Sequence, residues 1–77
     1  MQLKSLLRIV DKVEELNNLK VRINDAKIGF IQVDKNTQLT DKSFWVSQAP
    51  DEYSAVTYPV NSIEVLLSKE KEIAHAN

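Results

Sequence analysis

The chain has no cysteine, one glycine, two prolines and one histidine in 77 residues. Without cysteine it has no disulfide, no thiolate metal site and no thiol nucleophile. One glycine is too few for a glycine-rich phosphate loop. The histidine, His75, is next to the end of the sequence, so a Ser-His-Asp or zinc arrangement would depend on a frayed segment. We therefore expect a protein that is not an enzyme and that holds no metal or cofactor.

A large charge of one sign and long apolar runs are also missing. Ten basic and eleven acidic residues give a formal net charge of -1, which lacks the basic excess of an obligate nucleic-acid or lipid binder. No signal-like segment and no apolar run of about 18 residues appears, so we expect a cytoplasmic protein without a membrane partner. Acid–base chemistry by paired carboxylates is disfavoured because most of the aspartates fall in predicted turns, where this residue is common.

The length fits one small domain, residues 1–67, followed by a polar tail, residues 68–77. A chain of this size buries only about 60% of the surface that it exposes when unfolded, and small domains without disulfides often gain stability by association. We therefore expect a homo-oligomer. A monomer stabilised by its own core is the alternative.

Apolar residues at the start of the chain recur at spacings of three and four. They are Leu3, Leu6, Leu7, Val10 and Val13. This period predicts an amphipathic helix over residues 2–18, with the charged side chains mainly on its other faces. Neither glycine nor proline interrupts the pattern, and Asn17 and Asn18 suit a left-handed cap. The helix is expected to end near residue 17.

From residue 19 the apolar period changes to two, which predicts β-strands. The expected strands cover residues 19–23, 27–33, 43–48, 53–58 and 63–67. The first two form a hairpin around a turn at 24–26, and the polar residues 34–42 form a loop. Gly29 in the middle of the second strand predicts a bend. Pro59 has no N–H to donate and is expected to end the fourth strand.

These elements predict a mostly β fold with an N-terminal α-helix, in which five bent antiparallel strands form a small barrel. Short bent strands can hide their edges by curling into a barrel or by pairing between subunits. An alternative places residues 61–76 in a helix capped by Asn61 or Ser62, which leaves a four-stranded sheet with a helix at each end. The β-branched Ile63 and Val65 argue against this helix.

The order of these elements resembles the Sm/LSm family, including its bacterial RNA-chaperone branch, over residues 3–67. The first family motif is matched by Ile28, Gly29, Phe30 and Ile31, and it is approximated further along by Asp34, Gln38 and Leu39. The spacing between Gly29 and Asp34 is short by about one residue. The second motif is represented only by residues 58–62, which lack the basic residue that contacts bases in the family.

The resemblance implies a homo-oligomeric ring of about five to seven subunits, in which the fourth strand of one subunit pairs with the fifth strand of the next. Its interface residues would be Tyr53, Val56, Tyr58, Ile63 and Val65. Single-stranded RNA is the implied ligand, and DNA stays open. The RNA-binding residues would be Asp34, Lys35, Asn36, Gln38, Tyr58, Asn61 and Ser62. Amides and hydroxyls read base edges, Tyr58 stacks, and nearby lysines attract phosphates.

Two other functions stay open. An SH3-like barrel has the same number of strands and would hold a proline-rich or extended peptide in a groove made by Trp45, Tyr53 and Tyr58. Trp45 lies between Phe44 and Val46 and is expected to be structural. The third possibility is a small phage-type accessory protein that sequesters a host factor. An affinity for RNA that falls with salt would count against both alternatives.

Overall fold

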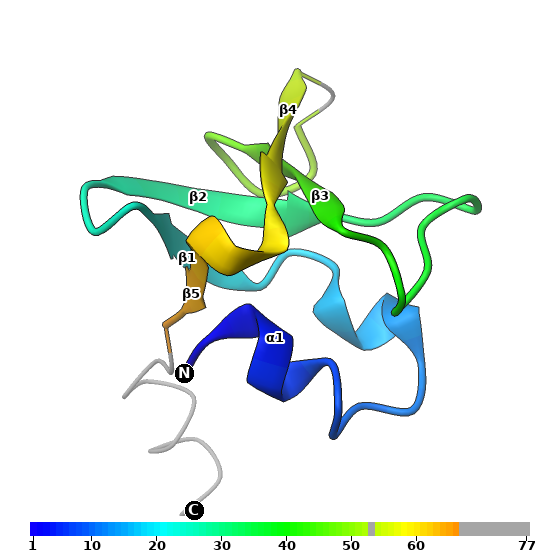
Figure 1. Ribbon diagram of the computed structural model, residues 1–77. Helices are drawn as coiled ribbons and strands as arrows, with labels where there is room; N and C mark the ends of the chain where they lie inside the picture. Colours follow the sequence, from blue (N-terminus) through cyan, green and yellow to red (C-terminus); the bar gives the residue numbers. More distant parts are fainter. Residues whose placement is uncertain (53, 67–77) are drawn as a thin grey trace, which may run out of the picture.

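Five short strands form one antiparallel sheet with the order β4-β3-β2-β1-β5 in the computed structural model, which describes residues 1–52 and 54–66 (Figure 1). The strands are β1 (Lys20–Ile23), β2 (Lys27–Gln32), β3 (Ser43–Ser47), β4 (Ala55–Pro59) and β5 (Ile63–Val65). A 3-10 turn, η2 (Val60–Ser62), joins β4 to β5. Because β4 and β5 are consecutive in the chain but lie at opposite edges of the sheet, η2 carries the chain from one edge to the other.

The mostly β character confirms what the period of two predicts. Strand β5 and η2 occupy the described part of the alternative helix over residues 61–76, so that helix is wrong there. The remainder of that helix, the tail at 68–77 and the last residue of the predicted fifth strand lie outside the described residues. The turn at 24–26 is also confirmed, with positive φ values at Asn24 and Asp25, as tight hairpins between twisted strands require.

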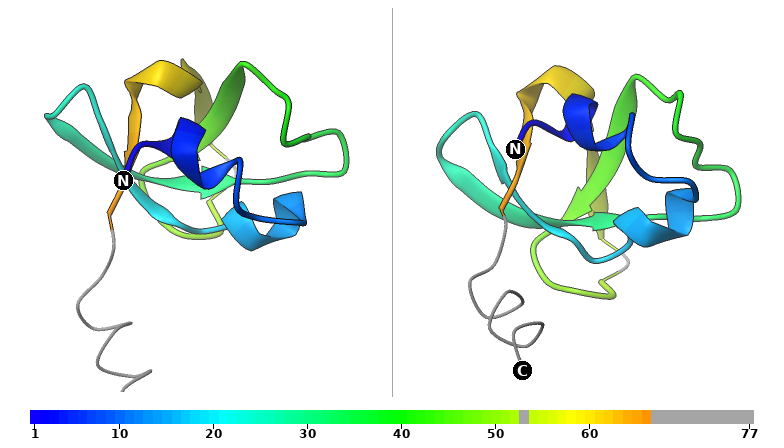
Figure 2. Two further views of the ribbon diagram at one scale, coloured as in Figure 1. Left: turned by 60° about the horizontal axis from the view of Figure 1, so that its bottom comes forward. Right: turned by 90° about the horizontal axis from the view of Figure 1, so that it is seen from below.

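The N-terminal segment forms one helical turn, α1 (Leu3–Leu6), and a separate 3-10 turn, η1 (Val13–Leu16). The predicted continuous helix over residues 2–18 is therefore wrong. Figures 1 and 2 show α1 on one side of the sheet, beside η2 and β5. In the part of the chain that the structure describes, no helix has the length and apolar character to cross a bilayer.

Local hydrogen bonding explains why the helix stops. The backbone N–H groups of Asp11 and Lys12 donate to the Glu15 carboxylate at 3.2 and 3.1 Å. In a continuous helix they would donate to carbonyls one turn earlier. The adjacent β-branched residues Ile9 and Val10 also lose side-chain freedom in a helix. The apolar spacing is thus satisfied by two short turns instead of one long helix.

One apolar core lies between the sheet and the N-terminal turns. Its fully or almost fully buried side chains are Leu3, Leu16, Val21, Ile23, Ile31, Phe44, Val46, Ile63 and Val65. The strands contribute these residues at alternate positions, as a sheet with one buried face requires. The N-terminal segment contributes Leu3 and Leu16, which have no exposed surface. Both turns are therefore part of the core.

The two ladders of strand β2 overlap at Phe30, next to the only glycine. Lys27 to Phe30 pair with β1, whereas Phe30 to Gln32 pair with β3. A Cβ at Gly29 would lie 2.9 Å from the Ser47 carbonyl oxygen and closer still to Val46 Cγ1. The φ angle of Gly29 is not positive, so close approach to β3 is the reason for glycine here.

Strand β4 includes Pro59, which lies opposite Ser43 of β3. The Val60 N–H donates to the Lys42 carbonyl at 2.8 Å. Because hydrogen-bonded pairs alternate with non-hydrogen-bonded pairs along an antiparallel ladder, Ser43 and Pro59 form a non-hydrogen-bonded pair. Pro59 thus directs its backbone away from β3 and costs no bond in the ladder. Strand β4 ends at Pro59, one residue later than predicted, because Pro59 is still paired with Ser43.

The same alternation turns the backbone groups of Ala55 and Thr57 to the outer edge of β4. Within the described residues, no other backbone group bonds to this edge. As far as the described residues show, strand β4 therefore presents an open edge with two N–H donors, those of Ala55 and Thr57.

The opposite edge strand, β5, is covered by the start of the chain. The Val65 N–H donates to the Met1 carbonyl at 2.6 Å, and the Met1 ammonium donates to the Val65 carbonyl at 3.2 Å. Gln2 forms a bridge with Glu64, and the Ile63 N–H donates to the Val60 carbonyl. Among the residues that the structure describes, the two edges thus differ, because β5 is occupied and β4 is open.

An ion pair joins β1 to β5. The Arg22 guanidinium donates to Glu64 Oε1 at 2.7 and 3.2 Å, and the two residues lie opposite each other in the ladder. The hydrogen bonds and charge of Arg22 lower the pKa of Glu64 and those of Glu64 raise the pKa of Arg22. The pair is partly exposed, so its contribution to stability is modest.

We expect the pair to make stability depend on acid pH. The pKa of Glu64 is lower in the folded chain than in the unfolded chain, so its stabilisation is present above the unfolded value and is lost as the pH falls through the folded value. From neutral to acid pH, the urea midpoint should therefore fall further for the wild type than for Glu64→Gln. Equal falls would contradict a lowered pKa.

Candidate binding groove

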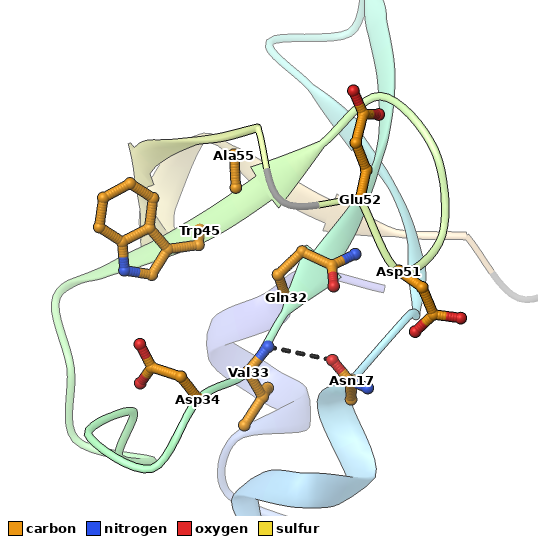
Figure 3. Close-up of a pocket in the computed structure, with 8 residues that line it drawn as sticks. All are labelled: Asn17, Gln32, Val33, Asp34, Trp45, Asp51, Glu52 and Ala55. Carbon is orange, nitrogen blue, oxygen red and sulfur yellow. Dashed lines mark hydrogen bonds between the residues drawn. The ribbon is translucent and has the colours of Figure 1, made fainter.

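An open cavity of about 490 Å³ lies on the face of β3 opposite the core (Figure 3). Its lining residues come from β2 and the loop after it, β3, the β3–β4 turn, the first residue of β4 and the end of η1. They are Asn17, Gln32, Val33, Asp34, Trp45, Asp51, Glu52 and Ala55. We call this cavity the Trp45 groove.

Trp45 is the large apolar surface of the groove. Its neighbours Phe44 and Val46 are buried, so the alternation of the strand turns Trp45 to the opposite face, where 45% of it is exposed. Gln32 and Thr57 lie beside it on the two neighbouring strands. The expectation that Trp45 is structural therefore holds only in part. A half-exposed tryptophan in a cavity is typical of binding surfaces, where this residue is enriched.

A polar network fixes the β3–β4 turn beside the groove. Asn18 Nδ2 donates to Asp51 Oδ1 at 2.7 Å, and the Asp51 N–H donates to Asn18 Oδ1 at 3.0 Å. Gln32 Nε2 donates to Asn18 Oδ1 at 3.1 Å and to Ser47 Oγ at 2.9 Å. Asn18 and Asp51 both have positive φ, at 63° and 58°. Two conformations that most residues avoid thus stabilise each other.

We expect Asn18→Ala to destabilise the fold more than Asn18→Gly. Alanine loses the side-chain bonds to Asp51 and Gln32 and is strained at positive φ, which together cost about 2 kcal/mol. Glycine loses the same bonds but accepts the backbone angle, so its cost should be about 1 kcal/mol less. Urea denaturation of both variants measures the difference. Equal midpoints would show that the backbone angle contributes nothing.

Asp34 lies at the other end of the groove and is held by its own loop. The Asn36 N–H and the Thr37 hydroxyl donate to Asp34 Oδ1 at 2.8 and 3.0 Å. These bonds lower the pKa of Asp34, so the carboxylate is ionised at neutral pH. Among the described residues, three acidic side chains line the groove, those of Asp34, Asp51 and Glu52, and no lysine or arginine does. The groove therefore carries negative charge.

Six of the seven predicted RNA-binding residues lie in two places, and the seventh, Tyr58, lies on β4. Asp34, Lys35, Asn36 and Gln38 are exposed in the β2–β3 loop, whereas Asn61 and Ser62 are on η2. The loop reaches η2 through the bond between Val60 and Lys42. Among the described residues, no hydrogen bond joins the two groups of side chains, and of these six residues only Asp34 lines the groove.

Tyr58 belongs to a second, smaller cavity of about 280 Å³ between β2 and β4. Lys27 Nζ donates to the Tyr58 hydroxyl at 3.1 Å and lies 5.7 Å from the ring centroid. Tyr58 therefore already has a cation on its ring. Val56, from the same strand, is 57% exposed.

The remaining predicted interface residues are distributed differently. Ile63 and Val65 are buried, with 0% and 2% of their surface exposed, so their side chains serve the core of this chain. Tyr53 lies outside the described residues. Val56 and Tyr58 on β4 thus remain as the predicted interface residues with accessible surface.

The chain matches no protein-family model, no curated protein and no solved structure. The class that its own structure defines is a mostly β protein with a five-stranded antiparallel sheet and a short N-terminal helix.

Sequence reasoning missed the acidic groove residues Asp51 and Glu52 and the residues that position them, Asn18 and Gln32. Asp51 and Glu52 read correctly as a turn, but nothing local shows which surface the turn covers. A usable signal was the alternation of the third strand, in which Phe44 and Val46 on the buried face leave Trp45 on the other.

Proposed function

We propose that this protein is a small SH3-like barrel that binds an extended segment of a protein partner in the Trp45 groove. The observation that carries the proposal is a half-exposed tryptophan in an open cavity on a face that the fold leaves uncovered. Aromatic grooves of this kind hold extended peptides, because the ring supplies a large apolar surface at little entropic cost.

The strand arrangement supports the small-barrel class. Strand β2 pairs first with β1 and then with β3, which bends the sheet around the core. The short η2 corner separates the two edge strands, as the small-barrel prediction requires. The three carboxylates of the groove favour a protein ligand over RNA, because they would repel phosphates.

A homo-oligomeric ring that binds single-stranded RNA is the second candidate. The observation that favours it is the open edge of β4, which could pair with another subunit. In that assembly the Met1–Val65 bonds would have to open so that β5 could accept the neighbouring β4. This requirement makes the ring the less favoured of the two functions.

Selection from a displayed random-peptide library tests the proposed function. The wild type is the selection target, and peptides that also bind Trp45→Ala are discarded. Peptides that depend on the groove should bind the wild type at least tenfold more tightly than Trp45→Ala, by anisotropy of a labelled peptide. Circular dichroism checks that Trp45→Ala is folded, and Ile9→Ala is the matched control, since Ile9 is 65% exposed and does not line the groove.

Two results would overturn the proposal. One is a selection that yields no peptide whose binding depends on Trp45. The other is a native mass of about five to seven subunits that takes up a short oligo-U strand at moderate salt, measured by light scattering. The second result would establish the ring instead.

A further inference from the structure

We propose that the partner segment binds as an added β-strand on the outer edge of β4 and places a basic side chain over Trp45. This inference rests on the proposed function and deepens it, because it names both the geometry and the chemistry of the ligand. The ligand class is an extended peptide with arginine or lysine at the position beside Thr57.

The edge of β4 has the hydrogen-bonding groups that an added strand needs. Thr57 and Ala55 direct their N–H and carbonyl groups outward, because the Val60–Lys42 bond sets the phase of the ladder. At the other sheet edge, Met1 already holds both backbone groups of Val65. An incoming strand therefore finds free donors on β4 and not on β5. Pro59 offers no donor, which limits the bonded stretch to Ala55 and Thr57 on the side of the groove.

The register brings the ligand to the tryptophan. Thr57 lies opposite Trp45 in the ladder, and paired residues project to the same face. A peptide residue beside Thr57 would then be two strand spacings, about 10 Å, from the backbone of β3. The indole ring and a long peptide side chain can cover that distance together. Ala55 is small and also lines the groove, so it leaves this path clear.

The charge of the groove selects a cation. The Asp34 carboxylate lies near the indole at one end of the cavity, whereas the carboxylates of Asp51 and Glu52 lie at its other end and point outward (Figure 3). A guanidinium or ammonium on the ring would gain a cation–π contact and would face the Asp34 carboxylate, in a groove whose other end is also acidic. An acidic peptide would meet repulsion from the same groups, which adds discrimination.

The fluorescence of Trp45, the only tryptophan of the chain, reports binding directly. The probe is a peptide of about eight residues, alternating threonine and valine, with arginine at two alternate positions. We expect it to change the Trp45 emission of the wild type. The same peptide with glutamate for arginine should bind at least tenfold more weakly.

Thr57→Pro tests the strand geometry. It removes one outward N–H and no bond to β3, and Pro59, which occupies the same phase of β4, shows that this strand accepts proline. We expect the arginine peptide to bind about tenfold more weakly to Thr57→Pro, because the hydrogen bond that the Thr57 N–H would donate is lost and the proline ring crowds the added strand. Thr57→Val keeps the N–H and should bind like the wild type.

Peptides methylated on alternate backbone nitrogens give a measurement that does not depend on a variant's folding. Methylation on the nitrogens that face β4 should abolish binding, and methylation on the other set should not. Suppose that both methylated peptides bind like the unmethylated peptide and that Thr57→Pro binds the arginine peptide like the wild type, while Trp45→Ala loses binding. Strand addition is then wrong, and the proposed function stands.

Other outcomes overturn the inference in distinct ways. No emission change with the arginine peptide, although selected peptides bind through Trp45, would reject the basic ligand. A dimeric mass by light scattering that reverts to monomer in Thr57→Pro would show that a second copy of this chain occupies the β4 edge. Binding of oligo-U that Thr57→Pro weakens would assign the edge to the ring.

Discussion

Gly29→Val should destabilise the domain by about 3 kcal/mol or more and could unfold it. A side chain at this position meets the Ser47 carbonyl oxygen and the Val46 side chain. The carbonyl belongs to β3, so relief requires the two strands to separate where β2 passes from β1 to β3. A domain of this size has a total stability of roughly 4–12 kcal/mol, so the loss is a large fraction of it.

The measurement is urea denaturation followed by far-UV circular dichroism. Gly29→Ala should show a smaller loss in the same direction, because its single methyl group meets the same atoms. Val46 belongs to the core, so Val46→Ala costs stability by itself, but the additional cost of Gly29→Ala should be smaller in the Val46→Ala background than in the wild type, since one of the two contacts is gone. A wild-type midpoint for Gly29→Val would show that β2 and β3 do not approach as closely as described.

Leu16→Ala should lower the free energy of unfolding by about 2–5 kcal/mol. Leu16 has no exposed surface although it lies in a four-residue 3-10 turn outside the sheet. Alanine would leave a cavity beneath the sheet. A turn of four residues has few ways to move and fill that cavity. The loss would demonstrate that the N-terminal segment is part of the core.

Val13→Ala is the matched control for Leu16→Ala, because it lies in the same turn and is only half-buried. Its loss should be less than half as large. If Leu16→Ala and Val13→Ala were equally mild, the first nineteen residues would be an appendage and not a part of the core.

The strands were predictable because alternation is a local signal. Val21 and Ile23 in one strand, and Phe44 and Val46 in another, show the buried face directly in the sequence. The turn at residues 24–26 could also be predicted from the sequence. The short corner before β5 was also recognised, although its helical turn type was not.

The N-terminal helix was not predictable in the same way. The spacing of Leu3, Leu6 and Leu7 fits one turn of helix as well as the start of a long one. The decision between them rests on the Glu15 carboxylate, which binds backbone N–H groups of residues 11 and 12. Propensity rules that consider only apolar period do not include this competition.

The groove and the covered edge depend on contacts between distant residues. Asn18 holds Asp51 across 33 positions of the sequence, and Met1 reaches Val65 across 64. Neither contact has a local signature. Pro59 was expected to lie just after the fourth strand, but it pairs with Ser43 as the last residue of β4. Its side of the ladder, which decides whether a missing N–H matters, is set by the contact with β3 and has no local signature.

The pairing of Met1 with Val65 also sets the order in which the domain can fold. The β1–β2 hairpin closes over a few residues and can form early, whereas the contact between Met1 and Val65 closes a loop that contains almost every described residue. Strand β1 gains its second neighbour only when β5 pairs with it, and β5 is covered only when Met1 pairs with Val65. Met1 should therefore be among the last of the described residues to reach its native partner, and folding should be slow for a domain with contacts so distant in the sequence.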